Sequence, residues 1–185
     1  QWGVDPSVLL DGSRYVWNLK TFGADLLNDD ETELLIDTPE AKEATKWFSE
    51  MYTKHEVAPS PQMSQTAEDP FVYGKVGMAI GGSWMLKQWT TLGQFDSDIA
   101  HVPHKAGRDP VYVVAGSGYA IPAASEKKDA AWDYLRELLS KDGMAYVWGE
   151  SGRGSPARES VWPTFLGAWT NKNAEVFPEA LKFGE

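Results

Sequence analysis

The sequence predicts an α/β fold, in which short strands alternate with helices. Apolar side chains recur at helical spacing in residues 39–54 and again after Ser125, whereas the short apolar run at 75–80 favours a strand. Strands that alternate with helices are typical of layered α/β proteins and not of all-β sandwiches. A chain of 185 residues with 42% hydrophobic side chains is long enough to bury such a core.

The first third of the chain predicts two helices and one strand. We expect a helix around 13–22 and a short strand near 33–36 in an otherwise polar, irregular stretch. Thr38 and Pro39 then supply an N-cap and a first-turn proline for a helix over 39–54. The face that this helix is expected to bury carries Ala44, Trp47, Phe48 and Met51.

The middle of the chain predicts two strands on either side of one helix. After a loop or short helix at 62–70, we expect strands at 75–80 and 98–102. Between them, Ser83 is expected to cap a helix over 84–92.

The last third predicts extended segments followed by helices. Residues 111–115 and 119–121 are expected to be extended, and Gly116-Ser117-Gly118 separates them. Ser125 is expected to cap the clearest helix, which carries Ala131, Tyr134, Leu135, Leu138 and Leu139 on one face and ends at Asp142-Gly143. Beyond it we expect a shorter helix at about 143–148, a loop at 151–156 and one or two short helices within 159–185.

Charge and composition exclude several classes of protein. The formal charge is −10, from 27 acidic and 17 basic residues, and no cluster of Lys and Arg could follow phosphates or anionic lipids. Nucleic acid and membrane surfaces are therefore not expected partners. The absence of cysteine excludes disulfides and thiolate chemistry, and no apolar run approaches the ~20 residues that span a bilayer. Because the chain starts at Gln1 and not at Met, we expect a processed product or a fragment of a longer protein.

No pattern indicates catalysis, a cofactor or a metal. Gly74-Lys75 lacks the glycine spacing of a phosphate-binding loop, and Gly116-Ser117-Gly118 lacks that of a nucleophile elbow. His101 and His104 are three residues apart, but the intervening proline opposes the helix that would bring both to one metal ion. The acidic run 28–33 lacks the glycine and the distant glutamate of a calcium loop.

The nine tryptophans are the compositional oddity of the chain. Trp47 and Trp132 lie on helical apolar stripes, so we expect both in the core. Trp17 and Trp84 lie near glycines, and we expect them to face a ligand. Gly81 and Gly82 precede Trp84, and without side chains they would let backbone amides approach that ligand.

Residues 71–84 carry a resemblance to a known family. The string FVYGKVGMAIGGSW is similar to the signature F-x-x-G-K-x-A-M-x-x-x-G-x-W of bacterial extracellular solute-binding proteins that serve carbohydrate ABC importers, with Gly77 in place of the usual alanine. Four further motifs follow the order of the family, in segments 17–25, 37–41, 99–122 and 129–132. The resemblance covers roughly residues 13–165.

The resemblance implies a periplasmic-binding-protein-like (type II) fold of which this chain holds an incomplete part. Residues 1–112 would form the C-terminal lobe, 113–118 a hinge crossing, and 119–158 a segment that completes the N-terminal lobe. Residues 159–185 would cross back and add helices to the C-terminal lobe. The remainder of the N-terminal lobe would then be missing, so the apolar stripe of 131–139 could be exposed, repacked or used in a dimer.

The resemblance also implies a sugar site in the cleft between the lobes. A pyranose offers an apolar face and a rim of hydroxyls, which aromatic rings and hydrogen-bonding groups recognise. Trp84 matches the position that stacks on sugar in the family. The other expected ligand-binding residues are Ser83, Gly82, Tyr15, Trp17, Arg14, Gly116 and Ser117.

The implied function is the capture of a sugar or oligosaccharide for uptake, without catalysis. The implied partners are the ligand and the permease subunits of the importer, and the implied location is extracellular or periplasmic, with a lipid anchor on the missing N-terminus. Two other classes stay open on the residues alone. A glycoside-acting enzyme would use carboxylates such as Asp11 and Asp25. A protein-interaction module would need neither of these two carboxylates.

Overall fold

The computed structural model describes residues 1–10, 12–64 and 69–184, and the side chains of residues 10, 12–14 and 64 also lie outside this description. The elements, in chain order, are β1 (Trp2–Asp5), η1 (Ser7–Leu10), α1 (Gly12–Thr21), α2 (Pro39–Thr53), α3 (Pro61–Ser64), β2 (Val76–Ala79), η2 (Ser83–Met85), α4 (Leu86–Leu92), α5 (Lys128–Leu138), α6 (Lys141–Met144), η3 (Ala145–Glu150), η4 (Glu159–Val161), α7 (Trp162–Ala168), α8 (Val176–Ala180) and η5 (Leu181–Phe183). The segments η1, η2, η4 and η5 are 3₁₀ helices, and η3 is a π-helix.

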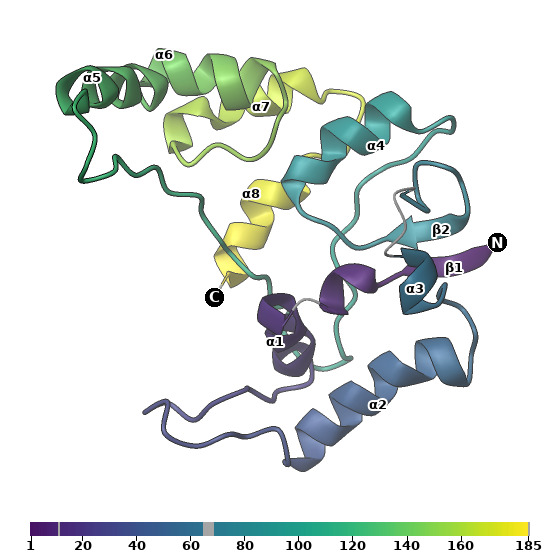
Figure 1. The fold of residues 1–185 in the computed structure, drawn as a ribbon. Coiled ribbons are helices and arrows are strands. Elements are labelled where there is room, and N and C mark those ends of the chain that lie inside the picture. The colour runs from purple at the N-terminus through teal and green to yellow at the C-terminus, as the bar shows by residue number, and fades with distance from the viewer. Residues whose placement is uncertain (11, 65–68, 185) are drawn as a thin grey trace.

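The two strands pair in parallel and lie at the right of the molecule in Figure 1, next to the N-terminus. Trp2 lies opposite Val76, and Val4 lies opposite Met78. The apolar run at 75–80 predicted β2, whereas β1 was not predicted, because its Gly3 and Asp5 are residue types that strands disfavour.

Two predicted strands, 33–36 and 98–102, are absent from the described structure. Residues 98–102 form no strand, while 33–36 contribute one isolated bridge, from Leu34 to Leu27. A strand requires a neighbouring ladder for its backbone groups. These two predictions were wrong because the described chain offers the segments no such neighbour. Residues 111–115 and 119–121, expected to be extended, form no helix, and Tyr112 makes one isolated bridge, to Gly184.

Helices α1 and α2 pack together in the lower half of Figure 1 and form most of the first core. As predicted, Thr38 caps α2, where its hydroxyl accepts a hydrogen bond from the Ala41 N–H at 3.3 Å, and Pro39 opens the helix. Two clusters of buried side chains lie along α1 and α2. They consist of Leu9, Trp17, Phe48, Met51 and Ala58, and of Leu19, Phe22, Ala41 and Ala44.

A third cluster joins α4 to the C-terminal helices. Leu86 at the start of α4 packs with Phe165 of α7 and with Trp169 and Ala174 beyond it. Phe165 is fully buried. Two segments about 80 residues apart in the sequence thus share one core, which holds the beginning of α4 in place.

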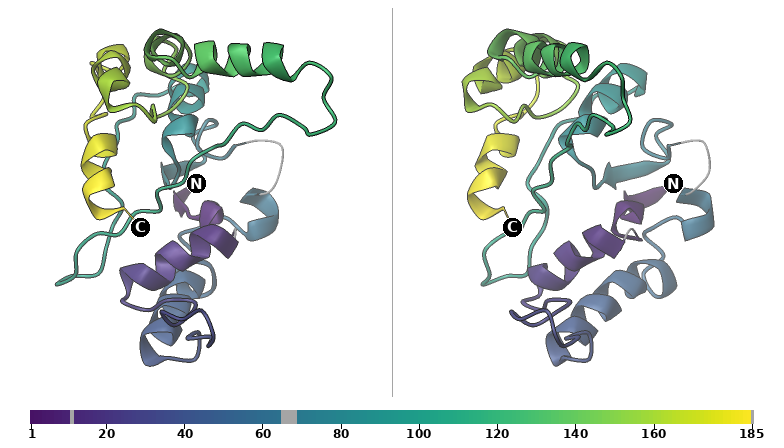
Figure 2. Two further views of the ribbon diagram at one scale, coloured as in Figure 1. Left: turned by 90° about the vertical axis from the view of Figure 1, so that its left-hand side faces the viewer. Right: turned by 60° about the vertical axis from the view of Figure 1, so that its left-hand side comes forward.

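Helices α5 and α6 lie with α7 at the top of the molecule in both views of Figure 2. Helix α5 buries none of its side chains, and Trp132 is 59% exposed. The prediction that Trp132 belongs to the core was therefore wrong, and the apolar stripe of 131–139 is unpartnered or half-buried in this chain. The prediction for Trp47 was also wrong, because its side chain is exposed. Its ring packs against that of Phe22 at the edge of the core, with 5.6 Å between the ring centres.

Candidate functional site

Trp84 lies in η2, between the glycine turn that follows β2 and the start of α4. Its side chain is 54% exposed, although the segment that carries it is held by packed neighbours on both sides. An exposed indole on a fixed backbone presents a broad apolar face to the surroundings.

The two glycines before Trp84 make room for indole rings. A Cβ at position 82 would lie 2.0 Å from Cζ3 of Trp84, and one at position 81 would lie 2.4 Å from Cη2 of Trp89. Both distances are far shorter than a carbon–carbon contact, so only glycine allows these rings to lie where they do. This use of the missing side chains was not indicated by the sequence.

The ring that covers Gly81 is itself anchored. Trp89 Nε1 donates a hydrogen bond to Oδ2 of Asp69 at 2.7 Å, and its ring lies 5.0 Å from that of Phe71. Asp69 also accepts the N–H of Phe71 at 2.9 Å. The glycine turn therefore rests on a fixed indole on the Trp89 side, while the Trp84 side faces outward.

Ser83 is bound to the loop at 151–156, which the sequence analysis had not connected with the site. Its hydroxyl oxygen accepts the N–H of Ser155 at 3.0 Å, so it does not cap the helix as predicted. A Cβ at Gly154 would lie 3.7 Å from the Cα of Trp84. A serine hydroxyl has further hydrogen-bonding capacity beyond one accepted bond.

The predicted site residues of α1 have other contacts in this structure. Trp17 is only 6% exposed, and its indole N–H donates a hydrogen bond to the carbonyl of Val111. The hydroxyl of Tyr15 lies 2.6 Å from that of Thr45 on α2. Trp17 therefore acts in packing here, Tyr15 is half-buried, and the side chain of Arg14 lies outside the described residues.

Gly116 and Ser117 lie in the extended, exposed segment that leads from Tyr112 to α5, which is visible as the long connection in Figure 1. A Cβ at Gly116 would meet no atom within 4 Å. The start of this segment is tied down, because the N–H of Tyr112 donates to the carbonyl of Phe183 at 3.1 Å. A free segment anchored at its start is a suitable place for a change of backbone angle.

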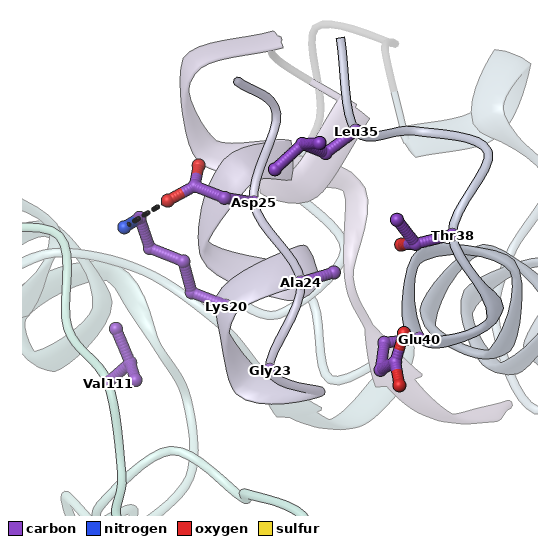
Figure 3. A pocket seen from close by; sticks show the side chains of 8 residues that line it. All are labelled: Lys20, Gly23, Ala24, Asp25, Leu35, Thr38, Glu40 and Val111. Atoms are coloured by element: carbon purple, nitrogen blue, oxygen red, sulfur yellow. Dashed lines mark ion pairs between the residues drawn. The ribbon is translucent and has the colours of Figure 1, made fainter. Parts of the chain in front are cut away.

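A pocket of about 340 Å³ lies between α1 and the beginning of α2 (Figure 3). Lys20 and Asp25, which both line it, form an ion pair at 2.7 Å. Partial burial acts to raise the pKa of Asp25, but hydrogen bonds from Lys20 and the Leu26 N–H outweigh it and hold this pKa below its usual value. The pocket contains none of the predicted site residues, and Asp11, the other carboxylate named for an enzyme, lies outside the described residues.

The described part of the chain holds no group of three or more His, Asp or Glu side chains that could bind a metal ion. His101 instead contacts the hydroxyl of Tyr112 and lies 3.1 Å from Oε2 of Glu179. The acidic run 28–33 folds around Asn28, whose Oδ1 accepts the N–H of Thr32 at 2.8 Å. None of the described helices is long and apolar enough to cross a bilayer.

Comparison with known families gives one match over most of the sequence. The profile of the family described as Bacterial extracellular solute-binding protein matches residues 9–178. No curated protein matches this chain significantly in sequence.

Solved structures share the fold. An ABC substrate-binding protein from Listeria monocytogenes in complex with cycloalternan superposes with a TM-score of 0.81 at 22% identity, over 100% of this chain and 47% of that one. A solute-binding protein from Thermotoga lettingae bound with α-D-tagatose gives a TM-score of 0.71 at 25% identity, over 92% and 47%. A maltose/maltodextrin-binding domain from Bdellovibrio bacteriovorus bound to maltotriose gives 0.73 at 18% identity, over 100% and 48%. The chain thus has a periplasmic-binding-protein-like fold and spans about half the length of these structures.

Proposed function

Because this chain belongs to the family of bacterial extracellular solute-binding proteins, we propose that it forms the sugar-recognising part of an ABC-importer receptor. The observation that carries the proposal is the exposed indole of Trp84, held over Gly82 on a turn that is anchored from behind by Trp89. An indole face fixed in this way suits the apolar face of a pyranose, because little conformational entropy is lost when the sugar stacks on it.

Polar groups around Trp84 complete the proposed site. The Ser83 hydroxyl and the backbone at Gly82 bind hydroxyls at the rim of the sugar. Gly116 and Ser117 offer backbone groups from the crossing, and Tyr15 and Arg14 add contacts from α1. Trp17 contributes by position, since its bond to Val111 ties α1 to the segment that leads into the crossing.

The proposed mechanism is closure of two lobes on the sugar. Residues 1–112 and 159–185 belong to one lobe, 119–158 complete the other, and 113–118 act as a hinge crossing. The proposal is supported by solved relatives whose names include cycloalternan, tagatose and maltotriose, and which are about twice as long as this chain. The receptor delivers its ligand to permease subunits at the outer face of the membrane, where a lipid anchor holds it.

We propose binding without catalysis. The family and the solved relatives are binding proteins. Asp25, a carboxylate that a glycosidase could have used, is bound to Lys20 at 2.7 Å. If the protein hydrolysed a chromogenic glycoside, this result would favour a glycoside-acting enzyme over a binding protein.

The proposal is tested by titrating sugars against tryptophan fluorescence in the full-length protein encoded by its gene. We expect a saturable change with at least one neutral sugar, and we expect Trp84→Ala to weaken its binding by about 10-fold or more, since an indole stack is lost in a desolvated cleft.

Trp47→Ala is the matched control, because Trp47 is an exposed indole on α2, away from the glycine turn. If Trp84→Ala binds the sugar with unchanged affinity, Trp84 is not part of the site. If no sugar changes the fluorescence, the proposed function is wrong.

A further inference from the structure

A second pocket, of about 460 Å³, lies along η3 and the loop that follows it. The side chains that line it belong to Tyr146, Val147, Glu150, Ser151 and Arg153. None of these residues belongs to the site proposed above.

The pocket carries the groups that a neutral sugar requires. Tyr146 is 72% exposed and offers a flat aromatic face. Glu150 supplies a carboxylate that accepts hydrogen bonds from hydroxyls, and Arg153 supplies a guanidinium that donates to them. Because one negative and one positive group face the same pocket, their charges balance, which favours an uncharged polyhydroxyl ligand over an anion or a cation.

The three polar groups are available for a ligand. Among the described residues, none pairs with the Tyr146 hydroxyl, the Glu150 carboxylate or the Arg153 guanidinium. The hydroxyl of Ser151 is already used, since it donates to the carbonyl of Val147. This bond holds the end of η3 against the start of the loop and thereby fixes the wall of the pocket.

The loop connects this pocket to Trp84. Gly152 and Gly154 are buried, whereas Arg153 between them is exposed. A Cβ at Gly154 would lie 3.7 Å from the Cα of Trp84. Since consecutive Cα atoms are about 3.8 Å apart, the Cα of Arg153 lies within about 9 Å of that of Trp84. The bond from the Ser155 N–H to Ser83, 3.0 Å long, fixes this spacing.

We propose that Tyr146, Glu150 and Arg153 form a second carbohydrate subsite, which continues from the Trp84 platform and makes the ligand a neutral oligosaccharide of at least two or three units. The inference rests on the proposed function, because it extends the same site. One sugar unit stacks on Trp84, and a further unit lies against Tyr146 between the carboxylate of Glu150 and the guanidinium of Arg153.

The test is calorimetric titration of the full-length protein with neutral sugars of increasing length. The probes are glucose, galactose, xylose and tagatose, then maltose, maltotriose, cellotriose and xylotriose, and cycloalternan. We expect a trisaccharide to bind at least about 10-fold more tightly than its own monosaccharide. Tyr146→Ala and Glu150→Gln should each weaken the trisaccharide by about 3- to 10-fold and change monosaccharide binding by less than 2-fold.

Tyr73→Ala is the matched control, because Tyr73 is an exposed tyrosine, 59% accessible, just before β2 and outside the pocket. A monosaccharide that binds as tightly as its trisaccharide would overturn the subsite and leave the Trp84 site standing. The subsite would also be overturned if Tyr146→Ala, like Tyr73→Ala, left the trisaccharide affinity unchanged. If no sugar of the panel binds, the proposed function fails and the subsite fails with it.

Discussion

Gly82→Ala is expected to move the Trp84 indole without unfolding the protein. The new Cβ would lie 2.0 Å from Cζ3, 2.2 Å from Cη2 and 2.5 Å from Cε3 of that ring. Carbon atoms in contact are about 3.5 Å apart, so the ring must shift by about 1.5 Å. The backbone of Gly82, at φ −96° and ψ 171°, is accessible to alanine, so the effect comes from the ring alone.

The expected loss is confined to ligand binding. Trp84 is more than half exposed, so a displacement of its ring should change the free energy of unfolding by less than about 1 kcal/mol. An aromatic stack contributes about 0.5–1.5 kcal/mol, and its misplacement should weaken sugar binding by about 2- to 10-fold. Calorimetric titration gives the affinity, urea unfolding gives the stability, and the tryptophan emission spectrum reports the move of the ring.

Gly167→Ala is the control, because a Cβ at that position on α7 would meet no atom within 4 Å. If Gly82→Ala binds sugar with unchanged affinity and keeps the wild-type emission spectrum, the indole does not depend on the glycine and the reasoning is wrong. A Gly82→Ala protein that fails to fold would refute it as well.

Two further predictions concern stability. Gly81→Ala should lower the free energy of unfolding by about 1–3 kcal/mol, because the ring of Trp89 is bonded to Asp69 and packed against Phe71, which leaves no room for a new Cβ; a loss below about 0.5 kcal/mol in urea unfolding would contradict this. Burial, helped by the charge of Asp5, raises the pKa of Tyr52 to about 12, above its ordinary value of 10.0. The unfolded chain therefore loses this proton first as the pH rises, and stability should fall between pH 10 and 12. Tyr52→Phe should reduce that fall when urea unfolding is compared at pH 8 and pH 11, and an identical fall in both proteins would rule out Tyr52 as its source.

Local signals in the sequence predicted the helices well. The Thr38 cap, the first-turn proline and the spacing of Ala44, Phe48 and Met51 predict α2, and the structure confirms both its start and its buried face. Such signals lie within a few residues of the element that they describe, so no tertiary information is needed to interpret them.

Long-range relations could not be predicted in the same way. The hydrogen bond between Ser155 and Ser83 joins residues 72 positions apart, and no pattern in the loop at 151–156 predicts which residue it contacts. The exposure of Trp132 could not be predicted for the same reason. An apolar stripe indicates that a helix face can be buried, but it does not indicate which element covers that face. The glycine pair was singled out from the sequence, yet its contact with two indole rings is visible only in three dimensions.

The central claim is that a sugar stacks on Trp84 in a cleft between two lobes. A crystal structure of the full-length protein with a bound sugar from the panel tests it most directly. The account predicts a pyranose ring parallel to the exposed face of Trp84, with residues of 119–158 on the opposite wall. A sugar bound elsewhere, or an indole of Trp84 that packs only against protein in the complex, would contradict it.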